Sequence, residues 1–320
     1  MNDKEYFARP ELSYSGLARF DKEGVAVFKS EQEHDKEYYH LGALVEEIIE
    51  GDIDSINAKF LVTDNVRPTA MLGDLADAMI ENHAAHNPTT AFTLAKGLGL
   101  WANIKNEATY TKKFDIPQFW GWLKLQNETR RIVSKDIYYM AKAMAKGLTE
   151  NEYTSHIFES SKENELISQP VIIWNNGKYK SKLDFIKINH KDKTITPYDL
   201  KTSAFPAADF RAQFYKFRYY IQSSMYTDAL REWAFTHHPD YTLKPFQFIV
   251  VSRTSPSLPI TYTVPDFIIN AGRDNFHNDA GELWRRGYVQ LTEDYEWHVN
   301  NDAYDYDRVV YESKGNIELT

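Results

Sequence analysis

Apolar residues at helical spacing dominate the first half of the chain. An amphipathic helix is predicted by five residues that stand three or four apart: Leu41, Leu44, Val45, Ile48 and Ile49. Gly51 follows them as a helix stop. A second helix is predicted by Ile137, Met140, Ala141, Met144 and Leu148. We also expect a short helix capped by a serine within residues 11–20, and a strand at "KFLVT", residues 59–63.

From residue 166 the pattern changes to short strands. The runs "QPVIIWNN", "KSKLDFIKIN" and "KTITPYDLKT" are separated by turn-rich segments, which predicts an antiparallel meander. A long aromatic helix is expected over residues 207–236, followed by strands at "FQFIVVS" and "ITYTV" and a helix across residues 265–287. The tail from Thr292 is acidic and rich in Tyr and Trp, and we expect it to pack loosely.

The chain shows no repeat, no low-complexity tract and no clear linker, which favours one elaborated α/β domain over residues 1–320. Within it, residues 1–165 are mainly helical. Residues 166–290 hold the predicted hairpin, the aromatic helix and the closing strands and helix. Residues 291–320 form the acidic tail.

Composition narrows the class of protein. With 320 residues, 42% of them hydrophobic, the chain can bury a large core. No run of about 18 apolar residues occurs and the first residues do not resemble a secretory signal, so we expect a cytoplasmic protein without membrane contact. The absence of cysteine excludes disulfides, thiolate zinc sites and Cys nucleophiles. The net charge of -9 argues against general coating of nucleic acid, but allows a local basic channel and a carboxylate-bound metal.

The strands on either side of residues 190–193 can pair so that Ile188 lies opposite Ile195. The same register places Asp184 opposite Asp199, and the period of two places Lys201 on the face of Asp199. Two facing carboxylates repel each other, so a cation between them is expected, and a hard divalent metal suits oxygen ligands.

The alternative is an ordinary solvated pair on an edge strand. The apolar neighbours of Asp199, which include Ile195, Tyr198 and Leu200, favour an interior strand instead, where an unpaired charge is costly.

These residues carry a resemblance to a known family. Asp184 followed by "YDLKT" resembles the core of the PD-(D/E)XK nucleases, and Gln222 with Tyr226 resembles the Q-x-x-x-Y signature of their RecB-like branch. The segment "LGALVEEIIEGD" is similar to "LGTAxHxxxLEP" of exonuclease VIII (RecE) proteins, which are related to lambda exonuclease. The likeness spans roughly residues 10–290. It implies a restriction-endonuclease-like α/β core, in which helices flank a central mixed sheet, with extra N-terminal helices.

The chain departs from this pattern at one position. Relatives carry His four residues after the helix glycine, where this chain has Gly42 and then Glu46. A carboxylate is a harder ligand than imidazole and suits Mg²⁺ or Mn²⁺, so Glu46 is a candidate third ligand. The alternatives are that Glu46 is a solvated helix residue or that His40 contributes instead.

The resemblance implies catalytic roles. Mg²⁺, or Mn²⁺ in its place, would be bound as one or two ions by Asp184, Asp199 and the backbone carbonyl of Leu200, with Glu46 as the candidate addition. Lys201 would position the attacking water and stabilise the transition state.

Gln222 and Tyr226 lie one helical turn apart and would bind the DNA backbone or brace Lys201. For Tyr226 the alternative is core packing.

Two further groups are candidates for DNA binding. A 5′-phosphate pocket is suggested by Ser13, Ser15 and Arg19, for which the alternative is a helix cap beside a surface arginine. A DNA channel is suggested by Arg130 and Arg131 with Trp120 or Trp122, for which the alternative is a solvated helix face.

The resemblance as a whole implies a metal-dependent exonuclease that degrades linear double-stranded DNA from 5′ to 3′ in phage-type recombination or DNA end processing. Such enzymes are typically homo-oligomeric rings that act on DNA ends with a single-strand annealing protein, in the host cytoplasm if phage-encoded. Two alternatives stay open: an endonuclease or end-trimming nuclease of the same superfamily, and a non-catalytic module that binds DNA ends or protein on a decayed nuclease fold.

Overall fold

The computed structural model describes residues 3–29, 37–84, 87–278 and 281–317. The chain forms two compact units, one of Met1–His34 with Ala143–Thr320 and one of Asp35–Lys142. The single elaborated domain expected from the sequence stays a prediction, because two compact units can belong to one domain.

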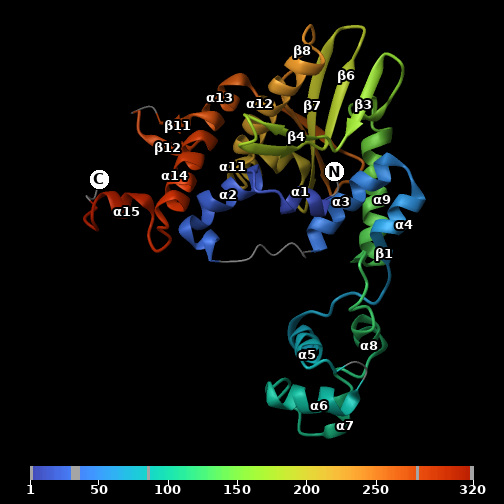
Figure 1. The fold of residues 1–320 in the computed structure, drawn as a ribbon. Helices are drawn as coiled ribbons and strands as arrows, with labels where there is room; N and C mark the ends of the chain where they lie inside the picture. Colours follow the sequence, from blue (N-terminus) through green and yellow to red (C-terminus); the bar gives the residue numbers. More distant parts are fainter. Residues whose placement is uncertain (1–2, 30–36, 85–86, 279–280, 318–320) are drawn as a thin grey trace. The chain divides into compact units, whose positions relative to one another are not determined.

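The first unit is built on a mixed sheet with the strand order β10-β9-β7-β6-β3 and with β8 beside β7 (Figure 1). The strands are β3 (Asn164–Ser168), β6 (Phe185–Asn189), β7 (Thr194–Ser203), β8 (Thr242–Leu243), β9 (Gln247–Ser252) and β10 (Ile260–Thr263). β7 pairs antiparallel with β6 and parallel with β8 and β9. The central mixed sheet expected from the sequence is confirmed.

Helix α12 (Tyr219–His237) is the central helix of this unit, and nearly all of its residues from Tyr220 to Leu230 are buried. It shares one hydrophobic core with the sheet and with α2 (Tyr14–Glu23), α13 (Asp266–Arg273) and α14 (Tyr288–Asn301). The other helices of the unit are α1 (Asp3–Ala8), η1 (Gly24–Phe28), α10 (Ser155–Phe158), η2 (Ala207–Asp209), α11 (Phe210–Lys216) and α15 (Arg308–Glu312). Helix α9 (Lys135–Glu150) begins in the second unit and ends in the first.

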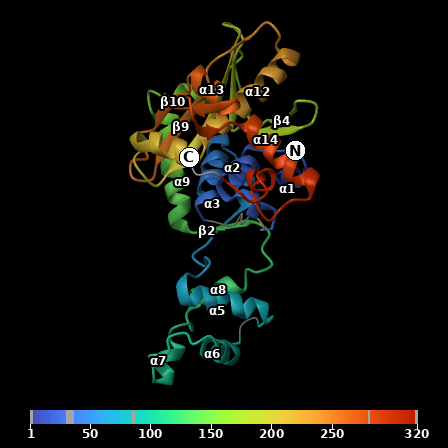
Figure 2. The ribbon, with the colours of Figure 1, turned by 90° about the vertical axis from the view of Figure 1, so that its left-hand side faces the viewer.

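The second unit is mainly helical. Its elements are α3 (Glu37–Glu50), α4 (Ile53–Lys59), β1 (Phe60–Val62), α5 (Ala70–Glu81), α6 (Pro88–Gly97), α7 (Glu107–Thr111), α8 (Pro117–Leu123) and β2 (Arg131–Val133). Figure 2 shows α5, α6, α7 and α8 as one group, which packs around a core of its own that includes Leu75, Met79, Tyr110, Phe114 and Phe119. The predicted helix stop is confirmed, since Gly51 follows α3 with φ of 85°.

The hairpin on either side of residues 190–193 forms with the predicted register, since Ile188 pairs with Ile195. Pro197 lies inside β7 but between the stretch that pairs with β8 and the stretch that pairs with β9. A proline has no N–H to donate. Neither β8 nor β9 pairs with β7 at this residue, so an interior strand can hold a proline here.

The expected meander is wrong in one respect, because the run at residues 180–189 is broken into β5 (Tyr179–Lys182) and β6. β5 pairs with β4 (Val171–Trp174) in a separate two-stranded sheet, whereas β6 pairs with β3. The segment that pairs with this run is interrupted at the matching position, between β3 and β4. There Gln169 has φ of 50°, and Pro170 cannot donate a ladder hydrogen bond.

The long helix expected over residues 207–236 is also broken, because α11 ends at Lys216 and α12 begins at Tyr219. Arg218 has φ of 60° and ψ of 34°, a left-handed conformation that no α-helix can pass through. Its guanidinium donates to the carboxylate of Asp21 in α2. This ion pair holds Arg218, the residue that precedes the first turn of α12, against α2.

The C-terminal expectations need two corrections. The helix expected over residues 265–287 ends at Arg273, because a turn with Gly281 at φ of 80° lets β11 (Asn275–His277) pair with β12 (Leu283–Arg286). The tail from Thr292 is not loosely packed over its first part, since it continues α14, whose Tyr295 ring lies 5.5 Å from that of Phe20. No helix in the described part of the chain is long and apolar enough to cross a membrane.

Candidate active site

Strand β7 carries a buried acid and a base on one face. Asp199 is 1% exposed, and its Oδ2 lies 2.6 Å from Nζ of Lys201, whose side chain is 18% exposed. The two residues stand two apart in an extended strand, so their side chains leave the sheet on the same side. The solvated edge pair that the sequence left open does not describe this geometry, because β7 is an interior strand and Asp199 is enclosed.

Asp184 comes immediately before β6 and reaches the same place. The pairing of β6 with β7 ends at Phe185 opposite Tyr198, and one further step in the same register leads to Asp184 and Asp199. Beyond that point β7 has no β6 partner, and Oδ2 of Asp184 accepts a hydrogen bond of 2.7 Å from the backbone N–H of Leu200. The N–H and C=O of one strand residue point to the same side. The carbonyl of Leu200 therefore points toward the side on which Asp184 lies.

Gln222 joins these residues from α12. Its Nε2 donates a hydrogen bond of 2.6 Å to Oδ1 of Asp199, and its side chain is buried. Its Oε1 is a buried acceptor without a hydrogen-bond partner among the described residues. Tyr226, one turn further along α12, is 7% exposed. Burial raises its pKa well above the usual value, and the charges of Asp199 and Asp184 add to this effect.

The electrostatics of the acid and base are coupled. Burial raises the pKa of Asp199, while Lys201 and Gln222 act in the opposite direction. Burial lowers the pKa of Lys201, but the charge of Asp199, with further contributions from Tyr219, Asp184 and Tyr14, outweighs it, so the pKa of Lys201 is raised overall. Lys201 is therefore an ammonium that neutralises an enclosed carboxylate.

The donor set suits a hard divalent metal. Asp184, Asp199 and the carbonyl of Leu200 offer only oxygen, which is what Mg²⁺ and Mn²⁺ prefer. Among the described residues no three acids or histidines gather closely enough to form a metal cluster. Glu46 lies on α3 in the other compact unit and is partly buried, so its role as a third ligand stays a prediction.

Two tyrosines near Lys201 were not among the residues singled out from the sequence. The Nζ of Lys201 lies 4.5 Å from the ring centre of Tyr219, three residues before Gln222 on α12. Burial raises the pKa of Tyr14, and the charges of Lys201 and Asp199 also act on it. The spacing of three from Gln222 could have indicated Tyr219. Tyr14 is brought near Lys201 only by the tertiary fold, and no spacing in the sequence could have indicated it. Its hydroxyl donates a hydrogen bond of 2.7 Å to the carbonyl of Phe217.

The residues predicted to bind a 5′-phosphate are occupied with local contacts. Ser13 caps α2 by accepting from the N–H of Gly16, and its hydroxyl lies 3.1 Å from that of Ser15. Arg19 pairs with Glu23 one turn further along the helix. These contacts match the alternative of a helix cap beside a paired arginine, and the phosphate pocket stays a prediction.

The second group of DNA-binding candidates lies in the second unit. Arg130 pairs with Glu128 at 2.7 Å, and Arg131 lies on β2 with its guanidinium 5.8 Å from the ring centre of Phe60. Trp120 is 5% exposed and donates to Asp115, so its ring packs in the core. Trp122 is partly buried. A channel along these residues stays a prediction.

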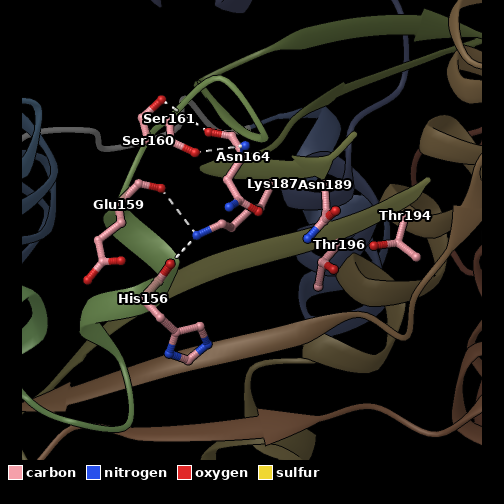
Figure 3. A pocket seen from close by; sticks show the side chains of 9 residues that line it. All are labelled: His156, Glu159, Ser160, Ser161, Asn164, Lys187, Asn189, Thr194 and Thr196. Atoms are coloured by element: carbon pink, nitrogen blue, oxygen red, sulfur yellow. Dashed lines mark hydrogen bonds between the residues drawn. The ribbon is translucent and has the colours of Figure 1, made fainter. Parts of the chain in front are cut away.

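A polar pocket of about 490 Å³ lies on the other face of the sheet (Figure 3). Thr194 and Thr196 of β7 line it. Because side chains alternate along a strand, these two point to the face opposite the one that carries Asp199. Lys187 reaches across it to backbone oxygens at the end of α10, including that of Glu159 at 3.2 Å. This lysine therefore holds α10 against the sheet, and none of the candidate catalytic residues lines the pocket.

A family model agrees with this fold. A family model described as "PDDEXK-like domain of unknown function (DUF3799)" matches residues 21–286. A crystal structure from Eubacterium rectale described as a "Putative exonuclease" matches at 12% sequence identity with a TM-score of 0.49, covering 100% of this chain and 94% of that chain. At this level of similarity the structural match assigns no function. No curated protein matches the chain.

Proposed function

The chain belongs to the family of PDDEXK-like domains of unknown function (DUF3799), and from this premise we propose that it is a metal-dependent deoxyribonuclease that hydrolyses phosphodiester bonds. One observation carries the proposal. The residue before β6, strand β7 and helix α12 together bring two acids, a lysine and a glutamine to one enclosed point, where Asp199 contacts both Lys201 and Gln222.

Each residue has a task that its contacts support. Lys201, held as an ammonium beside Asp199, would stabilise the negative charge that develops on the scissile phosphate. Gln222 orients the carboxylate of Asp199 through its hydrogen bond. Leu200 orients Asp184 in the same way through its N–H. The carboxylates are thus fixed before a substrate arrives, so little reorganisation is needed at the moment of reaction.

The metal would be held by Asp184, Asp199 and the carbonyl of Leu200. When bound, Mg²⁺ lowers the pKa of a water ligand and neutralises charge on the phosphate. Two carboxylates and one carbonyl are enough for one ion, so a second ion would need a further acid, and Glu46 is our candidate.

The finer proposal is a 5′-to-3′ exonuclease of the exonuclease VIII type, acting on linear double-stranded DNA in phage-type recombination. It is supported by the "LGALVEEIIEGD" segment and by the spacing of Gln222 and Tyr226. The same resemblance supports a ring-shaped homo-oligomer, a single-strand annealing partner and a place in the cytoplasm.

The test uses DNA substrates of different topology. Purified protein is incubated with Mg²⁺ and either 5′-phosphorylated linear duplex or open circular duplex, beside Asp199→Ala and Lys201→Ala. We expect the wild-type protein to degrade only the linear DNA and both variants to leave it intact. Cutting of the circle would replace the exonuclease proposal by an endonuclease. Intact linear DNA with the wild-type protein would refute the nuclease proposal.

A further inference from the structure

The ammonium of Lys201 has a second kind of partner besides Asp199, the aromatic ring of Tyr219. Nζ lies 2.6 Å from Oδ2 of Asp199 and 4.5 Å from the ring centre of Tyr219. The ring centre of Phe248, on the neighbouring strand β9, lies 5.7 Å from the same Nζ. An ammonium has three N–H bonds, so it can meet a carboxylate and a ring face at the same time.

The ring of Tyr219 is packed against other rings. It stacks on Phe210 of α11, with the ring centres 5.6 Å apart and the planes at 18°, and its centre lies 5.5 Å from that of Phe248. Both phenylalanines are buried in the hydrophobic core of the first unit. Tyr219 therefore presents its ring to Lys201 from a packed support.

The backbone that leads into Tyr219 is tied to α2 at two points. The hydroxyl of Tyr14 donates a hydrogen bond of 2.7 Å to the carbonyl of Phe217, and the guanidinium of Arg218 donates to the carboxylate of Asp21. These contacts hold the two residues directly before Tyr219, including the left-handed Arg218. The fold thus determines where the ring of Tyr219 lies.

A metal ion at Asp199 would take away the carboxylate that neutralises Lys201. The side chain of Lys201 is 18% exposed, so little water can replace that partner, and an enclosed charge without a partner is costly. The face of an aromatic ring attracts an ammonium, and the attraction grows as the contact loses water. A ring has no net charge, so unlike a carboxylate it leaves the charge of the ammonium available to a phosphate.

We propose that Tyr219 is a positioning residue for Lys201, and that its ring holds the ammonium when a metal engages Asp199. Lys201 then stays at the site as a cation without a carboxylate partner, the form that stabilises negative charge on a phosphate. The inference rests on the proposed nuclease function, in which Lys201 acts on the scissile phosphate. It gives α12 a second contribution to the site, besides the hydrogen bond from Gln222 to Asp199.

The test uses Asp199→Asn, which removes the charge of the carboxylate without any metal. The full chain is labelled with ¹³C at Cε of lysine, and the NMR signal of Lys201 is assigned by its absence in Lys201→Met. Protons over the face of an aromatic ring are shielded, so we expect an upfield Lys201 signal in the wild-type chain, with and without Mg²⁺, and in Asp199→Asn. When Tyr219→Leu is added to Asp199→Asn, the signal should move to the position of lysines without a ring contact. Loss of the upfield shift in Asp199→Asn or on addition of Mg²⁺, or an unchanged shift in the double variant, would overturn the inference.

Matched variants separate the ring of Tyr219 from its surroundings. Tyr219→Phe keeps the ring and should keep the upfield signal, and loss of the signal there would contradict a role of the ring. Phe217→Leu removes a half-exposed ring whose centre lies 5.8 Å from that of Tyr219, and it should leave the signal unchanged. Lys180, whose Nζ lies 4.9 Å from the ring centre of Tyr6, should give the same signal in every variant, which shows in the same spectrum that the chain is folded.

Cleavage rates give a second measurement. The contact of an ammonium with a ring corresponds to about two- to thirtyfold in rate, so kcat of Tyr219→Leu should fall by that factor while KM changes little. Tyr219→Phe should keep kcat, and an equal loss in both variants would overturn the role of the ring. Absence of cleavage by the wild-type chain would refute the nuclease proposal alone, because the spectra of Asp199→Asn test the ring contact without metal and without cleavage.

Discussion

The ammonium of Lys201 lies 2.6 Å from Oδ2 of Asp199, while Gln222 donates to Oδ1 of the same carboxylate. Both oxygens of an enclosed acid are therefore engaged by groups of this chain. A divalent metal at Asp199 would compete with Lys201 for the charge that it neutralises. The interaction of these two residues thus predicts how variants bind metal as well as how they react.

Lys201→Met should abolish cleavage and tighten metal binding. The methionine keeps much of the side-chain volume but removes the ammonium. The transition state then loses this stabilisation, and the rate of cleavage falls by about a hundredfold or more. Mn²⁺ then faces no competing cation at Asp199, and calorimetric titration should show a lower dissociation constant. Lys193→Met removes an exposed lysine that pairs with Asp240 at the hairpin turn, and it should change neither property. Weaker Mn²⁺ binding in Lys201→Met would contradict this competition.

Gln222→Leu should lower activity while the chain stays folded. The leucine fills similar space but cannot donate to Asp199, and a hydrogen bond to a charged group contributes about 1.5–3 kcal/mol. We expect kcat to fall by about ten- to a hundredfold. Gln290→Leu, which breaks a 2.8 Å hydrogen bond to Asn275 outside the site, serves as the control and should keep kcat. Full activity of Gln222→Leu would mean that Asp199 needs no orientation from α12.

The sequence predicted the centre of the site because its geometry is local. The register of one hairpin brings Asp184 to Asp199, and a period of two brings Lys201 to the same face. Gln222 was predicted only through resemblance, since no local rule brings a helix residue to a particular strand residue. Tyr14 was missed for the same reason, because its partner Phe217 is 203 positions away.

The elements were predicted well and their interruptions poorly. Apolar periodicity indicated the strands and helices, but it does not register a single left-handed residue such as Arg218, which divides the long aromatic helix. An arginine rarely adopts this conformation, and here an ion pair with Asp21 holds it. The interruption shapes the candidate active site, because it sets Tyr219 at the first position of α12, with its ring centre 4.5 Å from Nζ of Lys201.

Glu46→Gln should reduce the number of bound ions if this residue completes a second metal site. Equilibrium dialysis with Mn²⁺ counts the ions directly and does not depend on cleavage. We expect two ions per wild-type chain and one in Glu46→Gln, with Glu50→Gln, one turn further along α3, as the matched control. Equal counts in the wild-type chain and Glu46→Gln would remove Glu46 from the ligand set.

Gly272→Ala should destabilise the unit that carries the candidate active site. A Cβ atom at Gly272 of α13 would lie 2.3 Å from Oγ of Ser224 and 2.4 Å from the carbonyl oxygen of Tyr220, both in α12. Real Cβ atoms do not approach that closely, so the two helices must separate, which costs about 1–3 kcal/mol.

Gly16→Ala in α2 is the matched control, because its Cβ would lie 3.6 Å from Oγ of Ser13, an ordinary contact. An alanine within a helix contributes about 0.5–1 kcal/mol relative to glycine, so this variant should be as stable as the wild-type chain or more stable. Thermal unfolding monitored by differential scanning fluorimetry compares the two. A lower midpoint for Gly272→Ala together with partial loss of cleavage is expected, because α12 carries Gln222. An unchanged midpoint would mean that α12 and α13 have room between them, and the position of Gln222 would then not depend on their close packing.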